Sequence, residues 1–260
     1  MRIFNRLILS AAAMAAALSI TAASAQDVVR LGVEGAYPPF NSVNAAGELE
    51  GFDVDIAKAL CLEAELNCEF VFPLDWDGII PGLLAGNYDA IIASMSITEE
   101  RKKQVDFTNK YYNTPPAIAV PKDSSITDTS AASLAGKALG AQSATTHSNY
   151  AEAKFPDADL RLYPTADEYK LDIDSGRIDA VIDDVIVLSE WLATPEGACC
   201  KLLGTLVPDP VINGEGAGIA LRKGEDELKA KLNEAIEAIR SNGTYEAINA
   251  KYFDVDVYGG

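Results

Sequence analysis

Short apolar runs alternate with helical stretches along the sequence, and this alternation leaves few folds open to the chain. β-type runs at residues 28–33, 68–72 and 90–93 are separated by stretches of helical character at 51–62 and 79–85. Asp53 is the expected N-cap of the first of these helices. Strands and helices that alternate in this way form parallel sheets with helices packed on both faces. The sequence therefore predicts an α/β protein built on a mostly parallel sheet.

The segment IIASMSITEER, at residues 91–101, combines the end of a buried strand with groups that bind a carboxylate. Ser94, Ser96 and Thr98 place three hydroxyls within five positions, and Arg101 follows at a predicted helix start. Hydroxyl and backbone N–H groups donate hydrogen bonds, and a guanidinium can hold both oxygens of a carboxylate. The alternative is an ordinary helix start, capped by Ser96 or Thr98, with Arg101 in solvent.

Further polar and aromatic residues follow the neighbouring strands. Glu34 and Tyr37 come after the first predicted strand, and Trp76 comes after the second. Ligands of open α/β sheets bind beyond the carboxyl ends of the strands. We therefore expect these residues to meet the hydroxyls of residues 94–98 at one edge. Tyr37 is equally compatible with an ordinary core position, whereas a buried Glu34 requires a partner.

The N-terminal segment has the pattern of a secretory signal peptide. Arg2 and Arg6 precede an apolar run at residues 7–20, and Ala23-Ser24-Ala25 is an A-x-A cleavage site. No cysteine follows that run before Cys61, which argues against a lipid anchor. We expect residues 1–25 to be removed and the mature protein to reside in the periplasm.

The charge and the cysteine content exclude several classes of protein. The formal net charge is −18, and loss of a signal peptide with two arginines and no acid takes it to about −20. Such a chain lacks the basic surface that nucleic acids require, and it attracts small cations. With no C-x-x-C and a single histidine, His147, neither a metal site nor a cofactor is expected. We interpret His147 as an inert polar side chain and not as a general base. Cys199 and Cys200 are adjacent and either form a vicinal disulfide or stay reduced.

Two connections rich in proline or glycine divide the chain into lobes. Pro115 and Pro116 mark a crossover into a second lobe, and residues 204–218 lead the chain back. We expect the first lobe to contain residues 26–113 and 211–260, and the second lobe to contain residues 114–210.

The second lobe contains two further candidate sites. Gln142 opens a loop of small residues that runs into a helix at Thr145 and Thr146, where free N–H groups bind an anion or a threonine simply caps the helix. Asp183 and Asp184 follow a buried run and suit a metal, a helix cap or an ammonium group. Only one of them can face the cleft, because side chains alternate along a strand.

Several segments together resemble a known family over almost the whole mature chain: LGVEGAYPPF, GFDVDIAKALC, DWDGIIPGLLAGNYDAIIASMSITEER, SGRIDAVIDD and SNGTYEAINAKYFDVDVYG. They are similar to the periplasmic solute-binding proteins of ABC transporters for polar amino acids. The resemblance is strongest to the type that binds lysine, arginine and ornithine, or histidine. It implies a two-lobed type II binding-protein fold with a two-strand hinge, a disulfide between Cys61 and Cys68, and no catalytic activity. It also implies a monomer that delivers an amino acid to a membrane permease.

The resemblance also implies a role for each candidate residue. Tyr37 and Trp76 would enclose the ligand, and Glu34 would receive its distal cationic group. The ligand's α-carboxylate would bind Arg101, with help from the region of Ser96 and the backbone of Thr145 and Thr146. Asp184 would bind the α-ammonium, assisted by Ser94 or Ser96.

Four positions depart from the family pattern. Glu34 stands where aspartate is common, Trp76 replaces a phenylalanine, Ala93 replaces a serine that contacts ligands, and Gln142 replaces an apolar residue. These differences leave the choice among arginine, lysine, ornithine and histidine open. Opine-binding relatives share Glu and Trp at the first two positions and remain an alternative, as does a periplasmic dehydratase on the same scaffold.

Overall fold

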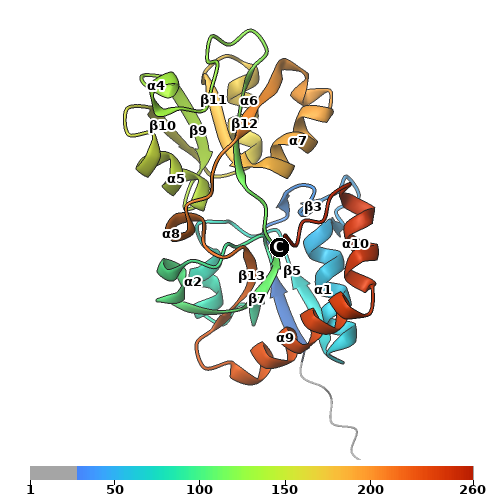
Figure 1. Cartoon of the computed structure of the whole chain (residues 1–260). Helices are drawn as coiled ribbons and strands as arrows, with labels where there is room; N and C mark the ends of the chain where they lie inside the picture. The colour runs from blue at the N-terminus through green and yellow to red at the C-terminus, as the bar shows by residue number, and fades with distance from the viewer. Residues whose placement is uncertain (1–27, 260) are drawn as a thin grey trace, which may run out of the picture.

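A computed structural model of the chain describes residues 28–259 (Figure 1). The predicted signal peptide, residues 1–25, lies outside the described residues. Within residues 28–259, no helix combines the length and apolar character that crossing a membrane requires.

One part of the chain, which we call the first lobe, is built on a sheet with the strand order β5-β1-β6-β13-β7. β5, β1 and β6 are parallel, whereas β13 runs antiparallel to both of its neighbours. A small antiparallel sheet, β2-β3-β4, adjoins it. The elements of this lobe are β1 (Val28–Gly32), β2 (Ala36–Tyr37), β3 (Asn41–Val43), β4 (Leu49–Glu50), α1 (Phe52–Glu63), β5 (Asn67–Val71), α2 (Ile79–Leu84), β6 (Ala90–Ile91), α3 (Glu99–Lys102), β7 (Val105–Tyr112), β13 (Ala217–Arg222), α9 (Asp226–Ser241) and α10 (Thr244–Tyr252).

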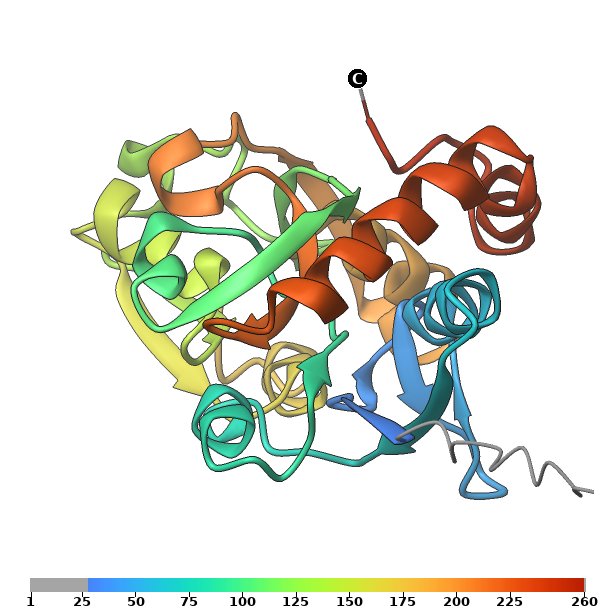
Figure 2. The same cartoon turned by 90° about the horizontal axis from the view of Figure 1, so that it is seen from below.

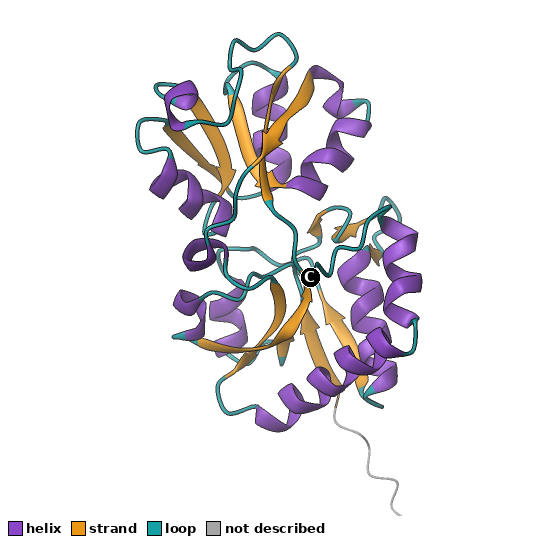
Figure 3. Cartoon of the chain, in the orientation of Figure 1, coloured by secondary structure: helices purple, strands orange, loops and turns teal. Residues whose placement is uncertain are grey.

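The second lobe repeats the same arrangement on the strand order β10-β9-β11-β8-β12. β10, β9 and β11 are parallel, and β8 is antiparallel to β11 and β12. Helices flank the sheet in each lobe (Figure 3). The elements here are β8 (Pro116–Pro121), α4 (Ala131–Leu134), β9 (Ala138–Gln142), α5 (Thr146–Lys154), β10 (Asp159–Tyr163), α6 (Ala166–Asp174), β11 (Ala180–Asp184), α7 (Val185–Ala193), the 3₁₀ helix η1 (Glu196–Cys199), β12 (Cys200–Thr205) and α8 (Pro210–Asn213).

The predicted α/β class with mostly parallel sheets is therefore confirmed. The sequence pattern missed β12, which pairs with β8. The chain passes between the lobes after β7 and again before β13 (Figure 1). Because the parallel strands of each sheet end toward the other lobe, the residues that follow them meet between the lobes.

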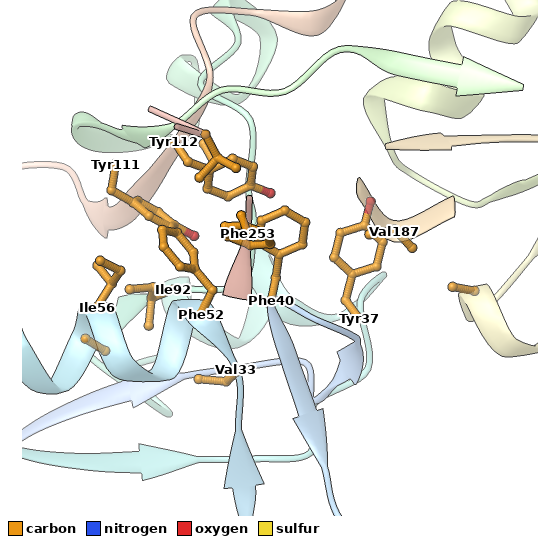
Figure 4. Packing of buried hydrophobic residues seen from close by; sticks show 14 of the residues in the cluster. Val33, Tyr37, Phe40, Phe52, Ile56, Ile92, Tyr111, Tyr112, Val187 and Phe253 are labelled. Carbon is orange, nitrogen blue, oxygen red and sulfur yellow. The ribbon is translucent and has the colours of Figure 1, made fainter. Parts of the chain in front are cut away.

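Helix packing follows the apolar periodicity of the sequence. α9 buries Leu232, Ala235, Ile236 and Ile239 and lies across β7 and α1 (Figure 2). An aromatic cluster that includes Phe40, Phe52, Tyr112 and Phe253 fills the space beside α1 (Figure 4). Tyr37 of the first lobe lies next to this cluster and near Val187 of α7, so the core continues from one lobe to the other (Figure 4).

The start of α1 corrects one expectation. Asp53 was the predicted N-cap, but the cap is Gly51, with a φ of 124° that favours glycine. A Cβ at Gly51 would lie 2.3 Å from the carbonyl oxygen of Phe40. Asp53 is instead fully buried, and its carboxylate accepts hydrogen bonds from Asn41, Ser94 and Tyr111.

All four cysteines are paired. The disulfide between Cys61 and Cys68 that the resemblance implies is present and joins the end of α1 to β5. Cys199 and Cys200, which the sequence left open, form a vicinal disulfide between η1 and β12.

Candidate ligand-binding site

The structure brings all ten candidate residues to one cleft between the lobes. Nine of them line one cavity together with Ala93 and His147: Glu34, Tyr37, Trp76, Ser94, Ser96, Arg101, Gln142, Thr145 and Thr146. Asp184 lines an adjoining hollow that shares Tyr37, Ser94, Ser96, Thr146 and His147 with the first. That these residues contact a ligand stays a prediction.

The segment that follows β6 is held in place by the strand that returns from the second lobe. The backbone N–H of Ile97 donates to Gly216, and that of Gly218 donates to Met95. Ser94 has a φ of 54°, an uncommon conformation for a residue other than glycine. The backbone of the predicted carboxylate-binding segment is thereby tied directly to one of the two connections between the lobes.

Arg101 combines features of the two alternatives that the sequence left open, and its binding of a carboxylate stays a prediction. Thr98 caps α3 by accepting a hydrogen bond from the backbone N–H of Arg101, as the ordinary-helix alternative predicts. The guanidinium, however, turns into the cleft. Its Nη1 donates to the carbonyl of Ser96 at 2.9 Å, and its Nη2 donates across the cleft to the carbonyl of Ala144 at 3.2 Å.

The Arg101 guanidinium lies 5.5 Å from the ring of Trp76 and has no carboxylate partner among residues 28–259. Burial lowers its pKa to about 10, so the side chain remains a cation at neutral pH. A buried charge normally has a counter-charge. An anion that enters the cleft would supply it.

The second lobe contributes the N-terminus of α5. Thr145 caps this helix in a reciprocal arrangement with Ser148, which confirms the capping alternative. The N–H of Thr145 is therefore engaged, whereas Thr146, at the first helical position, has no intrahelical acceptor for its N–H. The Oγ1 of Thr146 lies 3.4 Å from the Oγ of Ser96 in the first lobe.

Two carboxyl groups give the cleft its negative charge. Glu34 accepts a hydrogen bond of 2.6 Å from Gln142 across the lobes. Burial, with a smaller contribution from nearby acids, raises the pKa of Glu34 to about 7 despite this bond. Asp184 caps α7 and accepts a hydrogen bond from Thr114, and burial raises its pKa to about 7. With Arg101 as the cation, the ionised site is short of positive charge.

Direct contacts join the two lobes across the cavity. Trp76 donates to the carbonyl of Ala144, and Ser143 donates to Asp77. The cavity between them measures about 30 Å³ and adjoins the hollow of about 230 Å³ that Asp184 lines. These contacts hold the two lobes against each other over the predicted site.

Three residues of this region have contacts that the sequence did not predict. His147, interpreted as an inert polar side chain, lines both hollows, with Nδ1 3.2 Å from Oδ1 of Asp183. Burial lowers the pKa of His147. Asp183, unlike Asp184, lines neither hollow, and it accepts hydrogen bonds from Tyr37 and Tyr169. Asp53 accepts a hydrogen bond from the hydroxyl of Ser94. His147 directly follows Thr146 in the sequence, and this position beside a candidate site residue could have predicted that His147 lines the cleft.

Comparison with known proteins gives a consistent result. The family model described as bacterial extracellular solute-binding proteins, family 3, matches residues 29–255. The chain is 43% identical over 258 residues to the L-arginine-binding protein of Pseudomonas aeruginosa PAO1, covering 98% of this chain and 99% of that protein. It is 41% identical over 262 residues to the histidine-binding periplasmic protein of Salmonella typhimurium LT2, covering 98% and 100%.

A solved structure is similar as well. An ancestral arginine-binding protein bound to arginine superposes with a TM-score of 0.80 at 38% sequence identity. The match covers 87% of this chain and 98% of that protein.

Proposed function

Because this chain belongs to family 3 of the bacterial extracellular solute-binding proteins, we propose that it is a receptor for a free basic amino acid. The amino acid binds between the two lobes and is delivered to an ABC importer. The receptor is a periplasmic monomer that is exported by its N-terminal signal peptide. Its lobes correspond to residues 26–113 with 211–260 and to residues 114–210.

One observation carries this proposal: a half-buried cation, which has no acid partner within residues 28–259, shares a cleft with two carboxyl groups. Arg101 of the first lobe complements an α-carboxylate, and Asp184 of the second lobe complements an α-ammonium. Glu34 adds a second negative charge, which favours a ligand with a cationic side chain. Hydrogen bonds to charged groups contribute roughly 1.5–3 kcal/mol each.

The remaining residues complete the proposed site. Tyr37 and Trp76 form walls for the aliphatic part of the ligand, and a cation against an indole adds about 0.5–2 kcal/mol. Ser94, Ser96 and Gln142 supply polar contacts. The N-terminus of α5 supports the carboxylate through the free N–H of Thr146, and Thr145 caps the helix. A ligand that touches both lobes stabilises the closed arrangement because it binds that arrangement better than the open one.

Calorimetry with a panel of ligands tests this function. We expect arginine, lysine, ornithine or histidine to bind tightly, and glutamate and leucine to bind weakly or not at all. Tight binding of glutamate without binding of a basic amino acid would overturn the proposal. An opine that bound more tightly than every basic amino acid would favour the opine alternative, and turnover of a prephenate-like acid would favour the dehydratase.

The contribution of Glu34 is tested by Glu34→Gln. The amide keeps the length of the side chain and can still accept a hydrogen bond from Gln142, but it removes the negative charge. We expect the affinity for arginine to fall by about 10- to 100-fold, because a charged hydrogen bond is lost. The affinity for citrulline, a neutral analogue of arginine, should change much less. Glu168→Gln, on the exposed surface of α6, is the matched control.

The pKa values of about 7 for Glu34 and Asp184 predict a pH dependence. A cationic ligand binds the ionised carboxylates, so protons compete with it below about pH 7. Affinity for arginine should therefore rise between about pH 6 and 8, by roughly tenfold or more if both groups contribute. In the ligand-free protein, the free energy of unfolding depends on pH with the opposite sign. Both carboxyl groups stabilise the fold at low pH, and this contribution is lost as pH rises through about 7.

Calorimetry at several pH values, in buffers with different ionisation enthalpies, measures the number of protons released on binding. Glu34→Gln should lower this number. A flat pH profile in the wild-type protein would contradict the prediction.

A further inference from the structure

Asp183 is a buried carboxylate behind the cleft that lines neither hollow. Its Oδ1 accepts a hydrogen bond from the hydroxyl of Tyr37 at 2.5 Å and another from the N–H of Asp184 at 2.7 Å. Its Oδ2 accepts a hydrogen bond from the hydroxyl of Tyr169. The bond to Tyr37 crosses between the lobes, whereas Tyr169 belongs to the second lobe and lines neither hollow.

These bonds fix the direction in which the Tyr37 hydroxyl donates. A phenol has a single proton, and a carboxylate can only accept. The Tyr37 proton therefore points at Asp183, and the Tyr37 oxygen is left with its lone pairs as acceptors. Burial and the charge of Asp183 raise the pKa of Tyr37, so the hydroxyl keeps its proton. Tyr37 lines both hollows of the cleft.

Ser94, which follows β6 in the first lobe, is also a cleft hydroxyl that donates to a buried carboxylate. Its hydroxyl donates to the buried carboxylate of Asp53 at 2.9 Å, so its oxygen is also left as an acceptor. Two buried acids thus act on two hydroxyls that line the cleft.

We propose that Asp183 is a positioning residue that sets ligand specificity through Tyr37. By engaging the hydroxyl proton, Asp183 turns the Tyr37 oxygen into an acceptor for a side chain that carries only donors, such as an ammonium or a guanidinium. A ligand whose distal end presents a carbonyl oxygen meets lone pairs there. This inference rests on the proposed binding of a basic amino acid.

The test compares arginine with citrulline, in which a carbonyl oxygen replaces one nitrogen of the guanidinium. Calorimetry gives the ratio of the two dissociation constants for the wild-type protein, Tyr37→Phe, Asp183→Asn and the double variant. We expect Tyr37→Phe to reduce the preference for arginine by about tenfold, the value of one hydrogen bond of this kind. Asp183→Asn should reduce it by a smaller factor, because a neutral amide oxygen accepts the Tyr37 proton more weakly than a carboxylate does. In the Tyr37→Phe background, Asp183→Asn should change the ratio less than about twofold, because coupled residues are not additive.

The double variant distinguishes an effect of Asp183 through Tyr37 from a purely electrostatic effect of its charge. If Asp183→Asn reduced the ratio equally with and without the Tyr37 hydroxyl, Asp183 would act only as a distant charge, and the inference would be wrong. An equal loss of affinity for arginine and citrulline would show that Asp183 only holds the lobes together, which also overturns it.

Tyr169→Phe is the control, because it removes a partner of Asp183 and leaves Tyr37 unchanged; its ratio should equal that of the wild-type protein. If Asp183→Asn does not fold, Tyr37→Phe and Tyr169→Phe still decide, since equal ratios for these two variants would overturn the inference. A wild-type protein that binds no basic amino acid would overturn the proposed function as well. Binding of arginine with an unshifted ratio in the variants would overturn only the role of Asp183.

Discussion

Arg101→Ala is expected to weaken the binding of arginine by about 100- to 1000-fold, since removing one member of a buried charge pair costs roughly 2–5 kcal/mol. The guanidinium is the half-buried cation that faces the predicted carboxylate position. The ligand-free variant should be only slightly less stable than the wild-type protein, because Arg101 has no acid partner within residues 28–259 and loses only its hydrogen bonds to the carbonyls of Ser96 and Ala144. Calorimetry measures the affinity, and thermal unfolding measures the stability.

Agmatine, which is arginine without its carboxylate, shows whether the effect belongs to that group. Arg101→Ala should bind agmatine no more weakly than the wild-type protein does. Arg161→Ala is the matched control, because Arg161 lies on the exposed surface of the second lobe and pairs with Asp159. A variant at position 101 that bound arginine within about threefold of the wild-type affinity would exclude Arg101 from the site.

Asp184→Asn is expected to weaken the binding of arginine by about 100-fold, because the ligand ammonium would lose its counter-charge in a buried site. The fold should persist, since asparagine caps a helix about as well as aspartate and keeps an oxygen for the N–H of Ile186. Calorimetry of the variant, with circular dichroism as a check on folding, measures both effects.

The ligand that isolates this interaction is 5-guanidinopentanoate, which is arginine without its α-amino group. The wild-type protein should bind it weakly, and Asp184→Asn should bind it equally well or better. Asp157→Asn, at an exposed position before β10, serves as the matched control. If Asp184→Asn weakened both ligands by the same factor, the aspartate would act through the structure of α7 and not through the ammonium.

The assembly of the cleft was predictable because it depends on local rules. Polar residues directly after buried parallel strands must lie at one edge of their sheet. Glu34, Trp76 and Ser94 follow β1, β5 and β6, and Gln142 and Asp184 end β9 and β11. The alternation of side chains along a strand also predicts that only one of Asp183 and Asp184 faces the cleft. The missed strand β12 has a different cause: it is defined by pairing with β8, and its short, glycine-containing sequence carries no strong pattern.

The sequence by itself determined the order of strands and helices, the positions of the turns and which side chains stand at the strand ends, since each of these depends on neighbours within a few residues. Only the tertiary structure decided that Asp53 holds Ser94 instead of capping a helix, that Arg101 has no acid partner in the described chain, and that Tyr37 donates to Asp183. Tyr37 and Asp183 are 146 positions apart, and Glu34 and Gln142 are 108 apart. Burial, pKa and the direction of a hydroxyl proton depend on such distant partners, which local sequence patterns do not specify.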